Sequence, residues 1–331
     1  MIMRQSEERY ISLLTDFGFK RVFGSKPNKD LLMDFLNSLF DGFQVIRDVR
    51  FLNSEHVGDS PGGRKAIFDV YCENERGEKF IVEMQNAFQQ FFKDRSLFYS
   101  TFPIREQAVK GTDWDFRLSH VYVVALLNFD MREESFDPQD IVHDVGLLDK
   151  KTFRVFNDKL TFKYVEIAKF HKTEDELVTQ YDKWLYVLKN LSRLDRRPQA
   201  LRERIFTKLF EEAEIARFNP VELRQYEDSL KVYRDLNNSL KTALNQGIEQ
   251  GLKQGLEQGL KQGREQGIEV GREQGLKQGR EQGIEQGLEQ GRSEERASIV
   301  RRMLSAGMSA ESVAQMTGLS VEDVLALGSG R

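Results

Sequence analysis

A four-residue repeat fills residues 245–292 and limits the possible folds more than any other feature of this sequence. It begins NQGI, EQGL, KQGL, EQGL, and glycine recurs at every fourth position from Gly247 to Gly291. Glu, Gln, Lys, Leu and Arg favour a helix, but each Gly costs about 1 kcal/mol relative to Ala, so a lone helix is disfavoured. Two interpretations follow: a helix stabilised by self-association, which we favour, or a flexible polar linker.

The spacing of the glycines also bears on the partner of such a helix. A period of four exceeds the 3.6 residues of a helical turn, so the glycine row drifts around the helix and paired helices would wrap right-handed. The seven Lys and Arg of the repeat are offset by eight Glu, which argues against nucleic-acid binding by the repeat. We therefore expect a homo-oligomer that forms through this segment.

The composition sets the frame for the rest of the chain. Of its 331 residues, 39% are apolar and 24 are Phe, enough for a sizeable core. The net charge of −4 provides no general basic field, so a nucleic-acid partner would have to be attracted by local patches or by metal ions. The single cysteine, Cys72, suits a reducing cytoplasm and is expected to be a buried or half-buried structural thiol. No apolar run approaches the ~18 residues needed to cross a bilayer, so we expect no membrane partner.

Upstream of the repeat, hydrophobic spacing predicts a mixed α and β domain. Gly77 is expected to take a positive φ in the loop of a hairpin. Pro103 is expected to end or kink a helix, and Pro198 and Pro220 to break a helical region that starts at 174. The predicted helices are 30–40 and 87–102, and the predicted strands are 45–52, 65–73, 79–85 and 119–129, with a further hairpin of 152–157 and 161–170.

Two of these strands carry acidic residues among apolar ones. Acidic residues in strands more often simply face solvent, but the hairpin pairs the strand of Asp69 with that of Glu83 and Gln85. Two adjacent carboxylates resist ionising together unless a cation lies between them. Oxygen ligands favour Mg²⁺ or Mn²⁺, and a carboxylate-bound ion of this kind suits the hydrolysis of a phosphodiester.

Four short segments in order resemble one family, the Rpn family of recombination-promoting nucleases in the PD-(D/E)XK superfamily. The segments are TDFGFKRVFG (15–24), LLMDFLNSLF (31–40), FDVYCENERGEKFIVEMQ (68–85) and RSLFYSTFPIREQAVKG (95–111). The resemblance implies an α/β fold with a restriction-endonuclease-like core, a central mixed sheet flanked by helices. It divides the chain into a nuclease-like domain (1–172), a helical region (173–244), the repeat (245–292) and a C-terminal module (293–331).

The resemblance also assigns roles within the motif FDVYCENERGEKFIVEMQ. Asp69 matches the metal-binding Asp, Glu83 the acidic member of the (D/E)-x-K motif, and the Met84 carbonyl is a candidate third ligand. Gln85 occupies the place of the superfamily's usual Lys, although the Rpn-like branch commonly has E-x-Q. Gln offers only a neutral dipole, so the metal or a nearby cation must supply the missing charge.

Accessory residues are expected around this motif. Lys65, Lys20 and Arg95 are the candidate cations, and each can equally be an ordinary surface charge. Asp16 and Lys20 are four residues apart, as in a simple ion pair, and the resemblance favours placing them at the rim of the site. Arg95 and Tyr99 are spaced like a Gln and a Tyr that line the site of RecB-like nucleases.

The C-terminal segment 295–327 predicts three helices separated by turns. Ser309 and Ser320 are expected to be N-caps, and Gly307 and Gly318 to lie at C-caps. The spacing resembles a helix-turn-helix. The would-be recognition helix, SVEDVLAL, has no Lys, Arg, Gln or Asn to read bases, so a packing or dimerisation module is favoured over a DNA reader.

The sequence as a whole predicts a Mg²⁺- or Mn²⁺-dependent DNA endonuclease that acts in recombination or transposition. Its catalytic residues are Asp69, Glu83 and Gln85. One alternative is a catalytically inactive DNA-binding or assembly protein that self-associates through its tail. Another is an RNA or tRNA nuclease.

Overall fold

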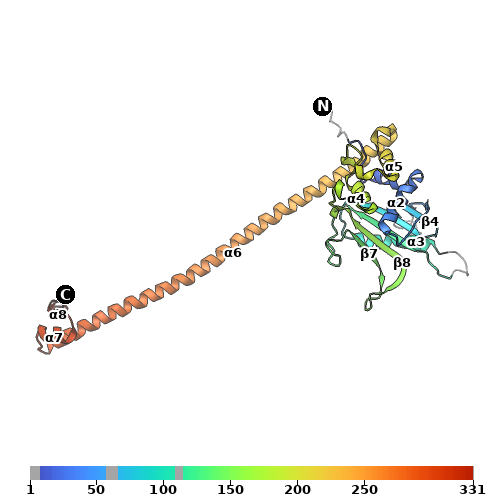
Figure 1. The fold of residues 1–331 in the computed structure, drawn as a ribbon. Coiled ribbons are helices and arrows are strands. Elements are labelled where there is room, and N and C mark those ends of the chain that lie inside the picture. The colour runs from blue at the N-terminus through green and yellow to red at the C-terminus, as the bar shows by residue number, and fades with distance from the viewer. Residues whose placement is uncertain (1–7, 57–65, 109–114, 331) are drawn as a thin grey trace, which may run out of the picture. The chain divides into compact units, whose positions relative to one another are not determined.

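The computed structural model describes residues 8–56, 66–108 and 115–330, and the chain divides into two compact units, Met1–Lys241 and Thr242–Arg331. The first unit contains the sheet and the helices packed on it (Figure 1). The second contains most of helix α6 (Pro220–Ser305) and two short helices.

Within the described residues of the first unit, six strands form a mixed sheet in the order β1-β4-β5-β6-β8-β7. The central strands β5, β6 and β8 are parallel, and β1, β4 and β7 join them in antiparallel pairs. A separate antiparallel pair is formed by β2 and β3. The bounds are β1 Val49–Phe51, β2 Glu55–His56, β3 Ala66–Ile67, β4 Val70–Asn74, β5 Lys79–Gln85, β6 Val121–Leu127, β7 Val142–Leu148 and β8 Val155–Glu166.

Helices cover both faces of this sheet, as the predicted architecture requires (Figure 1). On one face, Phe80, Val82 and Met84 of β5 join a core with side chains from α1, α2, α4 and α5. On the other face, Ile81 packs in a second core with Phe92 and Phe102 of α3. All seven residues of β6 are buried, as expected of a strand covered on both faces. The helices of this unit are α1 Asp16–Phe23, α2 Lys29–Phe40, α3 Phe92–Glu106, α4 Gln180–Asn190 and α5 Arg204–Glu212, with short 3-10 turns between several of them.

Several predicted elements differ from the structure. Residues 152–157 and 161–170 were expected to pair as a hairpin, but β8 is one continuous strand from Val155 to Glu166, and its antiparallel partner is β7. Helix α3 begins only at Phe92 and continues past Pro103 to Glu106, so this proline does not end it. The predictions of Gly77 at positive φ and of breaks at Pro198 and Pro220 are confirmed.

The predicted strand 65–73 is interrupted at Phe68 and Asp69, between β3 and β4. The Phe68 N–H donates to the Ser54 carbonyl (2.9 Å) instead of continuing the ladder of β4. The interruption lies directly before the β4–β5 pair, so the Asp69 main chain does not form the regular hydrogen bonds of a strand.

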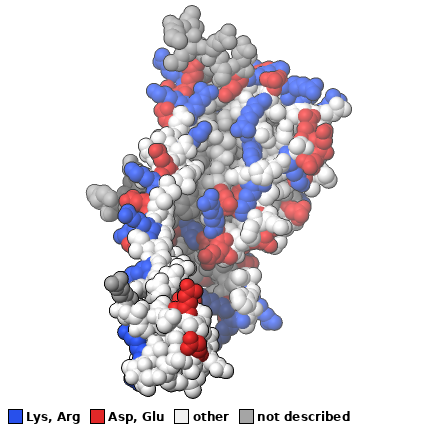
Figure 2. All heavy atoms as spheres, turned by 90° about the vertical axis from the view of Figure 1, so that its left-hand side faces the viewer, with Lys and Arg blue, Asp and Glu red and all other residues white. Residues whose placement is uncertain are grey.

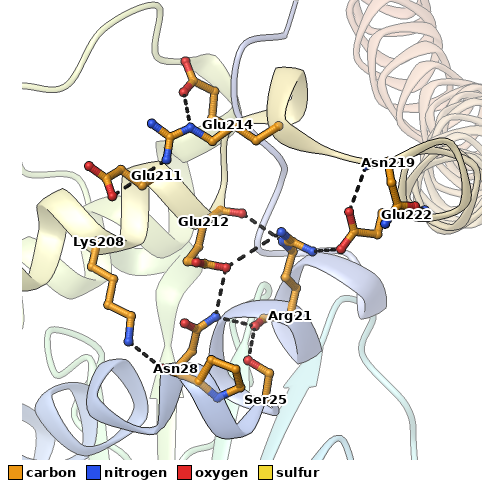
Figure 3. Close-up of polar contacts among 11 residues, drawn as sticks. Arg21, Ser25, Asn28, Lys208, Glu211, Glu212, Glu214, Asn219 and Glu222 are labelled. Carbon is orange, nitrogen blue, oxygen red and sulfur yellow. Dashed lines mark hydrogen bonds and ion pairs between the residues drawn. The ribbon is translucent and has the colours of Figure 1, made fainter.

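The start of helix α6 is fastened to α1 within the first unit (Figure 3). The Arg21 guanidinium pairs with Glu222 of α6 (2.6 Å) and donates through Nε to the Glu212 carbonyl at the end of α5 (2.9 Å). Further along α6, the Tyr226 hydroxyl accepts from the Ser12 N–H (3.1 Å) and the Ser229 Oγ accepts from the Phe17 N–H (3.1 Å). The first turns of α6 therefore hold the segment that enters α1.

In the second unit, the four-residue repeat is helical throughout, as we favoured. The small helices α7 (Ala310–Thr317) and α8 (Val321–Gly328) follow α6. Ser309 and Ser320 cap them, and Gly307 and Gly318 take positive φ after α6 and α7, which confirms these four predictions. The core of this module is small and comprises Val300, Val313, Ala314 and Val324.

Candidate active site

Asp69 and Glu83 face each other across the β4–β5 pair. Val70 lies opposite Val82 in the antiparallel register, which places the preceding Asp69 beside Glu83. The Asp69 N–H donates to Glu83 Oε1 (3.2 Å), and the Met84 N–H donates to Asp69 Oδ2 (2.8 Å). Each carboxylate thus reaches the main chain of the other strand. The two carboxyl groups lie side by side.

The local sequence explains why Glu83 is held in this position. Alternation along β5 directs Phe80, Val82 and Met84 to one core, so Glu83 shares the opposite face with Ile81. Its partner on β6 is Ala125, a small side chain. Glu83 is only 7% exposed. The carboxylate is therefore buried at the end of an apolar strand.

Gln85 lies between the carboxylate pair and a cation. Its Nε2 donates to Glu83 Oε2 (3.2 Å), and its Oε1 accepts from Nη2 of Arg95 (2.5 Å). The same guanidinium donates to Gln89 Oε1 (2.5 Å) and lies over the ring of Tyr99, 5.8 Å from its centroid. The structure thus brings Gln85, Arg95 and Tyr99 together with the carboxylates, and Arg95 is linked to Glu83 through the amide of Gln85.

Helix α1 contributes a second cation. Lys20 pairs with Asp16 at 2.7 Å, and its positive charge acts to lower the pKa of both Asp69 and Glu83. Gly18, between the pair, is packed so closely that an added Cβ would lie 2.1 Å from the Ser12 carbonyl oxygen. The close packing fixes α1 against its own entry segment. Lys65, the remaining predicted cation, lies outside the described residues.

The electrostatics of the carboxylate pair favour a cation. Burial raises the pKa of Glu83, and the neighbouring charge of Asp69 raises it further. Burial also raises the pKa of Asp69, against the Met84 N–H and the charges of Lys20 and Arg95, which lower it. A cation between the two groups would relieve both the desolvation and the mutual repulsion.

A hard divalent ion requires oxygen ligands, which the carboxylates of this site can supply. Over residues 8–56, 66–108 and 115–330, no three His, Cys, Asp or Glu side chains group into a metal cluster. The site thus offers two carboxylates, and main-chain carbonyls and water would have to complete the coordination of an ion. Mg²⁺ commonly binds in this way, through one or two carboxylates while keeping several waters. The residues present therefore fit Mg²⁺ or Mn²⁺, whereas zinc sites usually include His or Cys.

Some supporting residues could not be expected from the sequence. The Asn86 side chain donates to the Leu14 carbonyl (2.6 Å), which joins the end of β5 to the entry of α1. Gln89 helps to orient Arg95. Their position directly after the E-x-Q motif is the sole sequence signal for either residue, and it does not reveal their partners.

Other groups of this unit do not point to a competing chemistry. Cys72 is buried as predicted, and burial raises the pKa of its thiol to about 12, so it is no nucleophile at neutral pH. On the face shown in Figure 2, basic and acidic side chains of the described residues are interspersed. The view shows no broad area of a single charge.

The mixed sheet, its flanking helices and the carboxylates on adjacent strands define a protein of the restriction-endonuclease-like class. Residues 13–243 match the family model described as PD-(D/E)XK nuclease family transposase, and the chain belongs to this family. Residues 293–329 match the C-terminal HTH domain of the Rpn/YhgA-like nuclease family, which confirms the resemblance found in the sequence. No curated protein and no solved structure gave a significant match. Among the described helices, none is long and apolar enough to span a membrane.

Proposed function

We propose that this chain is a DNA endonuclease that hydrolyses phosphodiester bonds with Mg²⁺ or Mn²⁺ and acts in recombination or transposition. The observation that carries the proposal is the pair of adjacent carboxyl groups of Glu83, which is buried on β5, and Asp69, which is half-buried directly before β4. The Glu83 carboxylate accepts from the Asp69 N–H, and the Asp69 carboxylate accepts from the N–H of the next residue, Met84. The match to a nuclease family supports the same activity.

In this proposal each residue of the site has a separate role. Asp69 and Glu83 would hold the ion, with the Met84 carbonyl as a candidate further ligand. A bound divalent ion would orient a water molecule, lower its pKa and polarise a phosphoryl oxygen. Gln85 positions that water or the phosphate, and its amide is fixed by Glu83 on one side and Arg95 on the other.

The cations of the site offset the charge of the phosphate. Arg95, which is hydrogen-bonded to Gln85, supplies part of the positive charge that a lysine in the motif would provide. The planar guanidinium of Arg95 is also suited to binding a phosphate. Lys20 provides a second positive charge near the carboxylates and is held by Asp16. Tyr99 packs against Phe68, with ring centroids 5.3 Å apart, and forms one wall beside the site.

Residues 293–329 match an HTH domain, which supports DNA as the partner, in contrast to the packing or dimerisation module that the sequence favoured for this segment. The chain would self-associate through its repeat, where Leu and Ile side chains are exposed, for example Leu252 at 71% and Leu260 at 67%. Self-association would cover this apolar row. The single, buried cysteine supports a reducing compartment, the cytoplasm.

A plasmid-nicking assay tests the proposal. The full chain should convert supercoiled DNA to the open circle with Mg²⁺ or Mn²⁺ and should lose this activity in a chelator. Asp69→Ala should lower the rate by at least about 100-fold, because the ion loses a ligand. Glu73→Gln is the matched control, since this acid of the same strand pairs instead with Arg50 and Lys79.

Equal cleavage by the wild type and Asp69→Ala would remove the enzyme proposal. It would leave the non-catalytic DNA-binding or assembly protein. Cleavage of RNA or tRNA in preference to DNA in parallel reactions would instead favour the RNA-nuclease alternative.

A further inference from the structure

Three phenylalanine rings beside the candidate active site are exposed. Phe88 is 58% exposed, Phe91 67% and Phe98 42%. We call these three residues the aromatic stripe. Large exposed apolar side chains that gather in one place commonly mark a binding surface. The question is which partner the stripe is suited to bind.

Two rings of the aromatic stripe share one side of helix α3 with Arg95, a residue of the candidate active site. Phe91 is the N-cap residue of α3, and Phe91, Arg95 and Phe98 are spaced i, i+4 and i+7, which places them on one side of that helix. Arg95 lies between the two rings in this row and donates to Gln85 of the site. Phe88 belongs to the short connection between Gln85 and α3.

Two of these rings pack against other aromatic rings of the protein. Phe88 contacts Phe129 at a ring-centroid distance of 5.8 Å and an interplanar angle of 88°. Phe98 contacts the ring of Phe102 in the same manner, at 5.2 Å and 89°. Phe88 and Phe98 are thus held by a neighbouring ring while much of their surface remains open, as in a platform on which another flat group can stack.

The charges nearby favour a nucleic acid with unpaired bases. A duplex hides the faces of its bases and is held mainly by Lys and Arg contacts to its phosphates. Near the site, Arg95 is directed to Gln85, Lys20 is paired with Asp16, and Lys93 of α3 is paired with Glu133. A single strand can also stack its unpaired bases on exposed aromatic rings, which a regular duplex cannot do.

We propose that the aromatic stripe stacks with unpaired bases next to the phosphate bound at Asp69 and Glu83. The substrate would then be single-stranded or locally unpaired DNA rather than a regular duplex. The inference rests on the proposed nuclease function for the position of the scissile phosphate. The stacking itself can be measured without any cleavage.

The test is equilibrium binding of labelled oligonucleotides to the full chain in chelator, followed by fluorescence anisotropy. The probes are a 20-residue oligothymidylate, a duplex of equal length, and a 20-unit strand of the same charge with abasic sites in place of the bases. We expect the oligothymidylate to bind at least about fivefold more tightly than either of the others. A 20-residue oligouridylate separates DNA from RNA preference.

Variants of the stripe identify the surface involved. Phe91→Leu and Phe98→Leu should each weaken oligothymidylate binding by about five- to tenfold, since stacking is lost while an apolar side chain remains. Phe91→Trp should preserve binding. Phe156→Leu is the control, because Phe156 is 81% exposed at the start of β8, the opposite end of the parallel strands from Gln85.

The outcomes separate this inference from the proposed function. Equal binding of the abasic strand and the oligothymidylate, or no binding of any probe, overturns the stacking proposal. So does a change of oligomeric state in the Phe91 and Phe98 variants with unchanged oligonucleotide binding, since the stripe would then be a contact between two copies. Stacking without metal-dependent cleavage leaves the inference standing and removes the nuclease function.

Discussion

Gln85 occupies the position at which the wider PD-(D/E)XK superfamily usually has lysine. A neutral amide cannot stabilise developing negative charge as an ammonium group does. In this chain the amide connects Glu83 to the Arg95 guanidinium through two hydrogen bonds. The positive charge is therefore present near the site, but it comes from helix α3 rather than from the motif itself.

This arrangement makes a prediction for Arg95. Arg95→Met should lower the single-turnover cleavage rate by about tenfold or more, because the site loses a preorganised cation. Adding Gln85→Lys to Arg95→Met should recover much of the rate, since the lysine restores the charge at the motif. If the double variant cleaves no faster than Arg95→Met alone, the positive charge of Arg95 does not determine the cleavage rate.

His120 gives a prediction about stability at low pH. Burial lowers the pKa of its imidazole from 6.5 to about 4, despite the charges of Glu78 and Asp158, which raise it. The ring stacks on Tyr122 at 3.8 Å, and Nε2 bonds with Thr161 Oγ1. Between pH 6.5 and 4 the unfolded chain binds a proton at His120 and the folded chain does not, so the folded state loses stability as the pH falls.

Chemical unfolding of the wild type and His120→Gln at pH 7 and pH 4.5 measures this effect. The wild type should lose about 1–2 kcal/mol more than the variant, a value reduced from the full shift because His120 is only partly buried. Equal losses in the two proteins would show that His120 takes up its proton in the folded state as readily as in the unfolded chain.

The residues of the site differ in how well the sequence predicts them. Asp69, Glu83 and Gln85 could be found because strand alternation and a short hairpin place them near one another. The contacts that orient them could not be found. Gln85 meets Arg95 through the packing angle of α3, and Asp69 reaches the Met84 N–H because the strand is interrupted before it. Both depend on tertiary packing rather than on local pattern.

At the scale of elements, the hydrophobic pattern of the sequence correctly predicts segments whose own residues determine their secondary structure. Strand β5 matches the predicted 79–85, and α2 starts one residue before the predicted 30–40. The pattern failed for β8, whose two halves were predicted to be separate strands, and for β7, which was not predicted. The first half of β8 is largely exposed, and only pairing with β7 makes it a strand.

Helix α1 carries Lys20, and the position of this helix depends on Gly18. The missing side chain allows the helix to approach the Ser12 carbonyl, while the Gly18 N–H donates to Thr15 Oγ1. Gly18→Ala should lower the free energy of unfolding by about 2 kcal/mol, because a clash with main-chain atoms must be relieved by shifting the helix. Cleavage should fall as well, since Lys20 moves with α1.

Gly146→Ala in β7 is the control for Gly18→Ala in thermal unfolding. An added Cβ at Gly146 would be 3.7 Å from the nearest atom, the Leu160 carbonyl oxygen, an ordinary contact. Its melting temperature should change much less. If the two variants melt alike, α1 is not fixed by this close approach.

At the scale of the whole molecule, the repeat is a helix that carries twelve glycines and an exposed apolar row. An added Cβ at any glycine from Gly247 to Gly291 would meet nothing within 4 Å. In a lone helix, replacing them by Ala would therefore only stabilise, by about 1 kcal/mol each. If the glycines instead allow close approach of a second copy, Ala would keep the copies apart.

This contrast gives a test of self-association. Replacing Gly251, Gly255, Gly259 and Gly263 by Ala in the full chain should raise helicity measured by circular dichroism. It should also weaken the oligomer measured by sedimentation equilibrium. A monomeric wild type, or an oligomer unaffected by the four substitutions, would show that the glycines serve no helix–helix contact.

The proposed cleavage requires a divalent ion held jointly by Asp69 and Glu83. Anomalous diffraction from crystals of the full chain grown with Mn²⁺ tests it most directly. We predict one peak at about 2.2 Å from an oxygen of each carboxylate and no peak there in Asp69→Ala. A peak that contacts only one of the two carboxylates, or none at the pair under saturating Mn²⁺, would contradict it.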